Sequence, residues 1–155
     1  MNDKLEEIDN LVIVDSNFIL LPIQFSIDYI EEIIYIIEGK TKFIIYQQIL
    51  DELEAKKNRF KSKKSSIFQT QYHTGLKYLE IKRKNFNIFT DKHIKNDDET
   101  TDSFLLRRAL ELKNDLHNIK IYLATNDSEL RKKAKNLNIF TIFLRQKKYI
   151  SVESC

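Results

Sequence analysis

The chain has 155 residues, which suits one globular domain large enough to bury a core of its own. A hydrophobic content of 42% excludes a mainly disordered chain, and a single cysteine excludes both a disulfide scaffold and a cysteine-based zinc site. The first residues lack the basic and apolar segments of a signal peptide, and no apolar run approaches the ~20 residues of a membrane span. We therefore expect a cytoplasmic protein with no membrane partner.

Charge is segregated along the chain, although the formal net charge is only +3. Residues 56–84 include ten Lys or Arg residues and one Glu, and residues 131–148 include seven Lys or Arg residues and no acid. The remaining residues are therefore strongly acidic. Basic surfaces suit a polyanion and acidic clusters suit a cation, although either run can also form an ordinary solvated helix face.

Apolar runs and helical spacings alternate along the chain. Short β-branched or aromatic runs predict strands at residues 11–14, 43–46, 86–89, 119–124 and 139–144. Apolar residues at helical spacing predict helices over 24–38 (with Gly39 as C-cap), 47–57, 67–83, 101–112, and after Asn126 as N-cap. Residues 57–66 are expected to form a polar loop or a frayed helix end.

This alternation predicts an α/β fold with a central, mostly parallel sheet of four to five strands sandwiched by helices. No linker or repeat divides the chain, so we expect one domain over residues 1–155 with a core over about 11–150.

Acidic residues follow two predicted strands at the edge where open α/β sheets bind their ligands. Asp15 and Asn17 follow the first strand, and Thr125 and Asp127 follow the fourth. Asp102 opens the helix that leads into the fourth strand. Asp102 and Asp127 each have an ordinary explanation as well, because a carboxylate is stabilised near a helix N-terminus.

The helix after the second strand contains a further candidate. Asp51 points away from the apolar face of this helix, whereas Glu52 and Glu54 flank that face on opposite sides. Geometry alone does not choose between the two, and Glu52 is slightly favoured because it lies closer to the strand end. Carboxylates about 4 Å apart repel by about 4 kcal/mol at an effective dielectric constant of about 20. A hard cation such as Mg²⁺ or Mn²⁺ relieves this repulsion and can activate water to hydrolyse a phosphodiester.

These acidic segments resemble, in order, the motifs of PIN-domain nucleases. Residues 14–17 resemble the opening motif, 51–53 the helix glutamate motif, 101–103 the third acid and 124–131 the fourth, and the resemblance extends over about 11–150. It implies a flap-nuclease-like fold and a metal-dependent endoribonuclease acting on single-stranded RNA. It also implies a site in which Mg²⁺ or Mn²⁺ is bound by Asp15, Glu52, Asp102 and Asp127, with Asn17 and Thr125 as orienting polar residues.

Basic residues at the end of the second predicted helix and just beyond it are the expected contacts to the RNA backbone: Lys56, Lys57, Arg59, Lys61, Lys63 and Lys64. Among the aromatic residues of this basic segment, Phe60 is the most credible one to stack on an RNA base. Phe68 and Tyr72 instead fit helical core spacing. The basic insert and the tail 140–149 resemble the ribosomal-RNA-processing and archaeal branches more than compact toxin members. An rRNA-processing or a toxin role, a homodimer, and a ribosome-assembly or antitoxin-like partner all remain open.

Other interpretations of the same residues also remain. Asp97, Asp98 and Glu99 precede Asp102, so one of them could be the third metal ligand instead. A catalytically silent RNA-binding scaffold of the same fold would keep the basic surfaces without the reaction. A haloacid-dehalogenase-type phosphatase is suggested by Asp15-x-Asn17, but the second acid of that motif is Asn here, and the strand ending at Tyr46 lacks a Ser or Thr ligand for phosphate.

Overall fold

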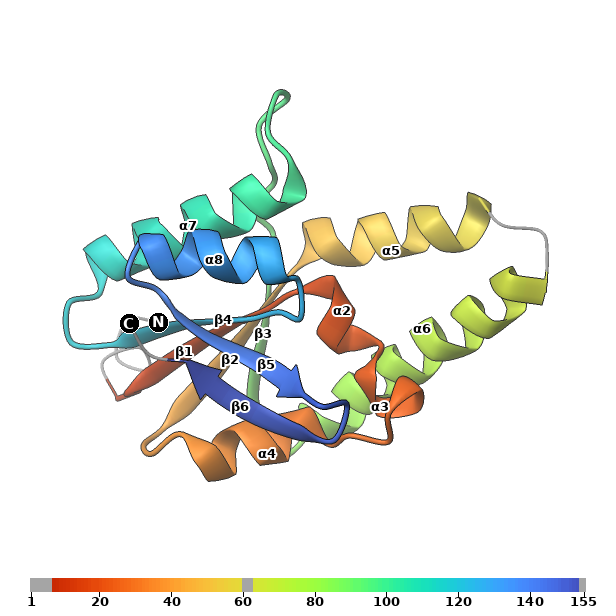
Figure 1. Cartoon of the computed structure of the whole chain (residues 1–155), viewed down its shortest axis with the longest axis horizontal. Helices are drawn as coiled ribbons and strands as arrows, with labels where there is room; N and C mark the ends of the chain where they lie inside the picture. The colour runs from red at the N-terminus through yellow and green to blue at the C-terminus, as the bar shows by residue number, and fades with distance from the viewer. Residues whose placement is uncertain (1–6, 60–62, 154–155) are drawn as a thin grey trace.

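The computed structural model describes residues 7–59 and 63–153 and shows a sheet flanked by helices (Figure 1). Within these residues the sheet has six strands in the order β3-β2-β1-β4-β5-β6. They are β1 (Asn10–Val14), β2 (Thr41–Tyr46), β3 (Asn87–Asp91), β4 (Lys120–Ala124), β5 (Phe140–Arg145) and β6 (Tyr149–Glu153). Strands β1 to β5 are parallel to one another, and β6 is antiparallel to β5. The predicted α/β fold class is confirmed.

Strand β6 makes the sheet larger than the four to five strands predicted. The hairpin that connects it to β5 turns at Gln146 and Lys147, which adopt φ angles of 53° and 58°. Hairpin turns of this kind usually contain Gly, Asn or Asp, because these residues tolerate positive φ. The sequence has none of them here, so the turn and the strand beyond it were not predicted.

The helices are α2 (Ser16–Ile19), α3 (Leu21–Gln24), α4 (Tyr29–Ile36), α5 (Gln47–Arg59), α6 (Lys63–Lys82), α7 (Thr101–Asp115) and α8 (Ser128–Asn136). The helix predicted over 24–38 is shorter, because the Asp28 side chain caps α4 at its N-terminus. Gly39 is not the C-cap, since α4 ends at Ile36 with Ile37 as its cap. Gly39 instead has a φ of 104° in the turn before β2, a conformation that favours glycine.

Two further boundaries differ from the prediction. Helix α5 continues to Arg59 and α6 begins at Lys63, so much of the segment predicted as a polar loop is helical. The N-cap of α8 is Asp127 rather than Asn126, because the Asp127 carboxylate accepts hydrogen bonds from the first turn. Among the described residues, no helix combines the length and hydrophobicity needed to cross a bilayer.

Helices α5 and α6 together extend beyond the sheet (Figure 1). Helix α6 returns to the body of the protein at Gly75, which is buried against α2. A Cβ atom at this position would lie 2.1 Å from the backbone carbonyl oxygen of Ile19. The glycine in the middle of this helix is therefore explained by a close approach of two backbones.

We predict that Gly75→Ala destabilises the protein, even though alanine favours a helix by about 1 kcal/mol over glycine. The added methyl group meets a backbone oxygen that cannot move aside as a side chain could, and overpacking of this kind costs roughly 1–3 kcal/mol. Urea unfolding measures the difference. Thr74→Ala on the exposed side of the same helix is the control and should be neutral or stabilising. A Gly75→Ala variant as stable as wild type would contradict the close approach.

A polar contact holds the end of α6 against the start of α4. The Tyr78 hydroxyl donates to Asp28, and Lys82 Nζ lies 2.7 Å from Asp28 Oδ2. The backbone N–H of Ile30 donates to the Tyr78 oxygen at 2.9 Å. Burial alone would raise the pKa of Asp28, but the hydrogen bonds from Lys82 and Tyr78 outweigh burial and hold this pKa below its ordinary value of 3.8.

Because the folded state lowers the pKa of Asp28, the ionised form stabilises the fold above the ordinary pKa, and this contribution is lost as the pH falls through the folded pKa. We predict that Asp28→Asn, which can still cap α4, lowers the free energy of unfolding at pH 7. The difference from wild type should shrink as the pH falls below 3.8. Chemical unfolding from pH 7 to pH 2 tests this, with the exposed Asp115→Asn as control. A difference that grows in acid would contradict the assignment.

Candidate active site

Strands β1 and β4 are neighbours, but the chain continues from them in opposite directions across the sheet. From β1 it proceeds to β2 and β3, and from β4 to β5. Open α/β sheets bind ligands at such a switch point, in the crevice beyond the carboxyl ends of the strands. Val14 of β1 pairs with Ala124 of β4, so Asp15 and Thr125 leave the sheet side by side.

Asp15 is buried at this point, with only 5% of its surface exposed. Its Oδ1 accepts the N–H of Ser16 at 2.7 Å, which caps the short helix α2. Its Oδ2 accepts the Thr125 hydroxyl at 2.7 Å and the Asn17 amide at 3.2 Å. The carboxylate is therefore fixed by neutral donors from the segments that follow both strands.

The same polar contacts connect the segments after β1 and β4 with each other and with the end of β5. Asn17 Oδ1 accepts the Asn126 N–H at 3.1 Å, and Thr125 Oγ1 accepts the Asp127 N–H at 3.1 Å. Asn126 Oδ1 in turn accepts the Leu144 N–H at 2.7 Å. Asn17 and Thr125 thus hold Asp15 and the start of the Asp127 loop in one arrangement.

The carboxylates at this edge influence one another. Burial raises the pKa of Asp15 and the charges of Asp102 and Asp127 raise it further, against hydrogen bonds from Thr125 and Ser16 that lower it. Burial also raises the pKa of Asp102, followed by repulsion from Asp127 and Glu52, while Lys133 lowers it. The fold thus brings all four predicted acids into one electrostatic neighbourhood.

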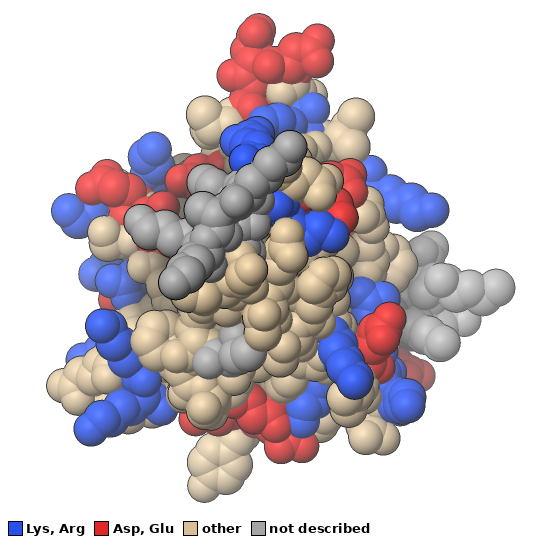
Figure 2. Space-filling model, turned by 90° about the vertical axis from the view of Figure 1, so that its right-hand side faces the viewer, with Lys and Arg blue, Asp and Glu red and all other residues tan. Residues whose placement is uncertain are grey.

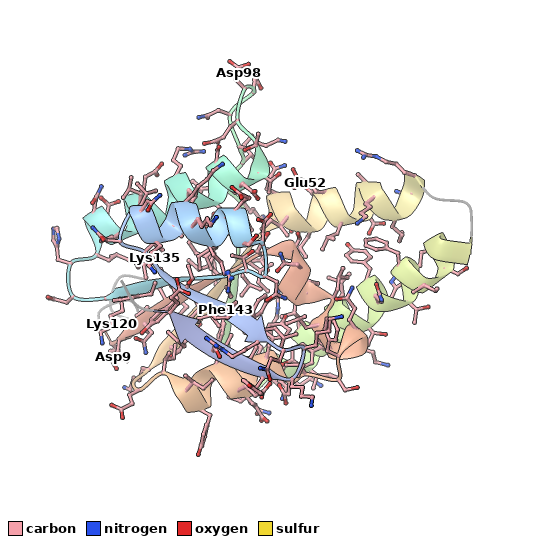
Figure 3. The ribbon with its side chains drawn as sticks, in the orientation of Figure 1. Asp9, Glu52, Asp98, Lys120, Lys135 and Phe143 are labelled. Atoms are coloured by element: carbon pink, nitrogen blue, oxygen red, sulfur yellow. The ribbon has the colours of Figure 1, made fainter. Side chains whose placement is uncertain are left out.

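Glu52 reaches this neighbourhood from α5, and Figure 3 shows it near the first turn of α7. The Thr101 hydroxyl lies 2.5 Å and 2.7 Å from its two carboxylate oxygens. Lys95 Nζ is 3.4 Å from Glu52 Oε1, and the Gln48 amide donates to the same oxygen at 3.3 Å. Glu54 instead pairs with Lys57 at 2.7 Å, so the structure brings Glu52, not Glu54, to the other acids.

Asp127 has two roles available at once. Its Oδ1 accepts the N–H groups of Glu129 and Leu130 at 2.9 and 3.1 Å, as an ordinary helix cap does. Its Oδ2 makes no hydrogen bond with the described part of the chain. The helix-cap explanation therefore holds for one oxygen, and the other is available to a ligand.

The acids of the loop before α7 lie apart from this edge. Asp98 is at the tip of that loop (Figure 3), and both Asp97 and Asp98 are exposed. Glu99 accepts two hydrogen bonds from Arg107, at 2.7 and 2.9 Å, and these bonds lower the pKa of Glu99 to about 2. This loop therefore supplies an ion pair and exposed charge rather than a third ligand.

The donor set suits a hard divalent cation, because it consists of carboxylate oxygens whose mutual repulsion a positive charge relieves. Between residues 7–59 and 63–153, no three His, Cys, Asp or Glu side chains are close enough to hold one metal ion together. Mg²⁺ does not need three, since it commonly keeps several water ligands and binds one or two carboxylates together with substrate phosphates. The residues present fit such a hydrated ion.

Two of the six basic residues predicted to contact RNA have partners within the protein. Lys57 pairs with Glu54 and lies 5.9 Å from the ring of Tyr72, and Lys56 lies 4.8 Å from the ring of Phe68. Arg59 is exposed at the end of α5. The predicted contacts Phe60 and Lys61, and the side chains of Lys63 and Lys64, lie outside the described residues. Figure 2, which faces this end of the molecule, shows Lys and Arg interspersed with Asp and Glu around the margin, so the described residues show no continuous basic surface on this face.

Four residues of the site neighbourhood were not predicted from the sequence: Gln48, Lys95, Thr101 and Lys133. Gln48 lies one helical turn before Glu52, and Thr101 directly precedes Asp102, so their positions were a usable signal. Lys95 and Lys133 reach the acids from the loop after β3 and from α8. Only the tertiary structure brings these lysines to the site.

Comparisons with known proteins agree with this geometry. The family model described as a PIN like domain matches residues 12–147. The chain is also similar to a solved structure of the PIN domain endonuclease Utp24, with a TM-score of 0.64 and 23% identity, covering 94% of this chain and 92% of that one. No curated protein sequence matches. At this identity the solved structure shows a common fold, and the family match over most of the sequence establishes that the chain belongs to the PIN-like domain family.

Proposed function

We propose that this protein is a metal-dependent endoribonuclease that hydrolyses phosphodiester bonds in single-stranded RNA, as one domain and with Mg²⁺ or Mn²⁺ as cofactor. The observation that supports this proposal best is Asp15, a buried carboxylate at the switch point whose hydrogen-bond donors are all neutral. The fold shared with a PIN domain endonuclease adds support. A processing role in ribosomal RNA is part of the proposal, with a ribosome-assembly factor as the expected class of partner.

In this proposal Asp15 and Asp102 are the principal metal ligands, and Glu52 and Asp127 complete the site directly or through water. When bound, the metal would neutralise phosphate charge and make water a better nucleophile. Thr125, Asn17 and the Ser16 N–H hold the Asp15 carboxylate in a fixed orientation. Thr101 and Gln48 hold the Glu52 carboxylate in the same way. The ligand side chains are therefore already oriented before a metal binds.

A catalytically silent RNA-binding scaffold is the second candidate, and one observation favours it. Lys95 Nζ is 3.4 Å from Glu52 Oε1, and the charge of Lys133 lowers the pKa of Asp102. Cations of the chain itself therefore balance part of the acidic charge. A scaffold would bind RNA without turnover at saturating Mn²⁺. The nuclease assay below separates the two functions.

We predict that Asp15→Asn reduces Mn²⁺-dependent cleavage of an unstructured RNA by at least about a hundredfold. Loss of a ligand removes transition-state charge stabilisation of several kcal/mol, and each ~1.4 kcal/mol is a factor of ten. Asp115→Asn, at the far end of α7, changes the same charge and should cleave normally. Cleavage that survives both a chelator and Asp15→Asn would end the metal-hydrolysis proposal.

Metal binding has a readout that does not depend on cleavage. A ligand that binds only the folded state raises the free energy of unfolding by about 1.4 kcal/mol at ten times its Kd. We therefore expect Mn²⁺ to raise the Tm of wild type and of Asp115→Asn, and to leave the Tm of a double variant, Asp15→Asn with Asp102→Asn, nearly unchanged. Equal shifts in all three proteins would place the metal elsewhere.

The basic end of α5 gives a separate prediction. Arg59→Gln should weaken RNA binding and reduce the slope of log K against log salt by about 0.7, as for one lost phosphate contact on a single strand. Lys57→Ala should act mainly on stability, because Lys57 contacts Glu54 and Tyr72. Fluorescence anisotropy at several salt concentrations measures both. An unchanged slope for Arg59→Gln would make this residue an ordinary solvated charge.

A further inference from the structure

A second feature lies beside the carboxylate edge, between α8 and the β5–β6 hairpin. A polar-walled pocket of about 380 Å³ is lined there by Asn126, Arg131, Phe143, Arg145 and Glu153 among others. Figure 3 shows Phe143 on β5, the strand of the sheet that lies below α8 in this view. Asn126 belongs to both places, because it lines the pocket and directly precedes Asp127.

Two guanidinium groups gather on one aromatic ring in this pocket. The central carbon of Arg131 lies 4.0 Å from the centre of the Phe143 ring, and that of Arg145 lies 5.4 Å from it. Arg145 Nε donates to Ser151 at 3.2 Å, which leaves its other donors for a ligand. An aromatic ring attracts a nearby guanidinium without neutralising its charge.

Arg131 has an incomplete set of partners. Its Nε–H is buried and has no acceptor within residues 7–59 and 63–153, and no carboxylate of that part of the chain pairs with the guanidinium. Glu153 is the acid in the pocket wall, and it lies 3.5 Å from Lys135, so its charge is partly balanced. A buried donor without an acceptor is uncommon in folded proteins, and a bound anion or water is one way to satisfy it.

We propose that this pocket binds an internal phosphodiester of single-stranded RNA, with Arg131 as the main ligand and Arg145 as the second. This inference rests on the proposed function and places the RNA strand beside the four acids. A planar guanidinium fork matches two phosphate oxygens, and its open face can stack with an unpaired base. The Asn126 side chain, which accepts the Leu144 N–H at 2.7 Å, links this anion pocket to the Asp127 loop. A strand held here therefore passes directly beside the carboxylates.

Binding of a fluorescent 5′-hydroxyl RNA without divalent metal tests the proposal, since no cleavage then occurs. Arg131→Gln should weaken binding by roughly tenfold or more, as for a lost charge-assisted hydrogen bond, and Arg145→Gln by less. The two losses should be non-additive in the double variant, because both side chains contact one phosphate. Lys120→Gln, at the opposite end of β4, removes the same charge and should bind like wild type.

The outcomes separate this inference from the endonuclease proposal. Affinities of Arg131→Gln and Arg145→Gln equal to that of Lys120→Gln would overturn the pocket, whether or not the wild type cleaves RNA. An Arg131-dependent preference for 5′-phosphorylated RNA, with no loss on 5′-hydroxyl RNA, would assign a terminal phosphate and overturn the internal one. Arg131-dependent binding without Mn²⁺-dependent cleavage would keep the pocket and remove the endonuclease. Because Arg131 packs on Phe143, the Tm of Arg131→Gln is first compared with that of wild type. Arg145 is exposed, so Arg145→Gln tests the pocket independently of any loss of stability.

Discussion

The buried carboxylate of Asp15 is the constraint on which the rest of the site depends. It sits where β1 and β4 diverge, and both its burial and its acidic neighbours disfavour its charged form. Its donors are a backbone N–H, a hydroxyl and an amide, none of which carries a charge. For folding alone such a buried acid is unfavourable. An external cation would relieve the same repulsion, and this is the physical basis of the proposed metal site.

The positive charges of the chain lie around this acid without pairing with it. Lys95 pairs with Glu52, and the charge of Lys133 lowers the pKa of Asp102. No Lys or Arg of the described chain pairs with Asp15. The two basic segments, residues 56–84 and 131–148, also have different roles. In the first, Lys82 holds α6 to α4 and Lys57 packs on Tyr72. In the second, two arginines gather beside Phe143, next to the site.

Helix α6 illustrates how a local disadvantage supports the whole fold. A glycine in the middle of a helix costs stability locally. At Gly75 this cost permits the helix to approach the Ile19 carbonyl and so to lie against α2. The contact of Tyr78 and Lys82 with Asp28 then fixes the far end of the same helix. These two contacts hold α6, and with it the end of α5, at a defined place beside the sheet.

The sequence by itself determined the strands β1 to β5, most helices and the order of the four acids, because apolar periodicity and the residues that follow each strand are local properties. The family resemblance also predicted Asn17 beside Asp15 and Thr125 beside Asp127. The structure places Thr125 against both acids, because Val14 and Ala124 end neighbouring parallel strands. Only the tertiary structure decided between Glu52 and Glu54, moved the cap of α8 from Asn126 to Asp127, and added β6. Glu52 and Asn126 have partners distant in sequence, Thr101 and the Leu144 N–H, and the turn before β6 needs positive φ angles that Gln and Lys do not favour. Neither kind of information is encoded in local spacing.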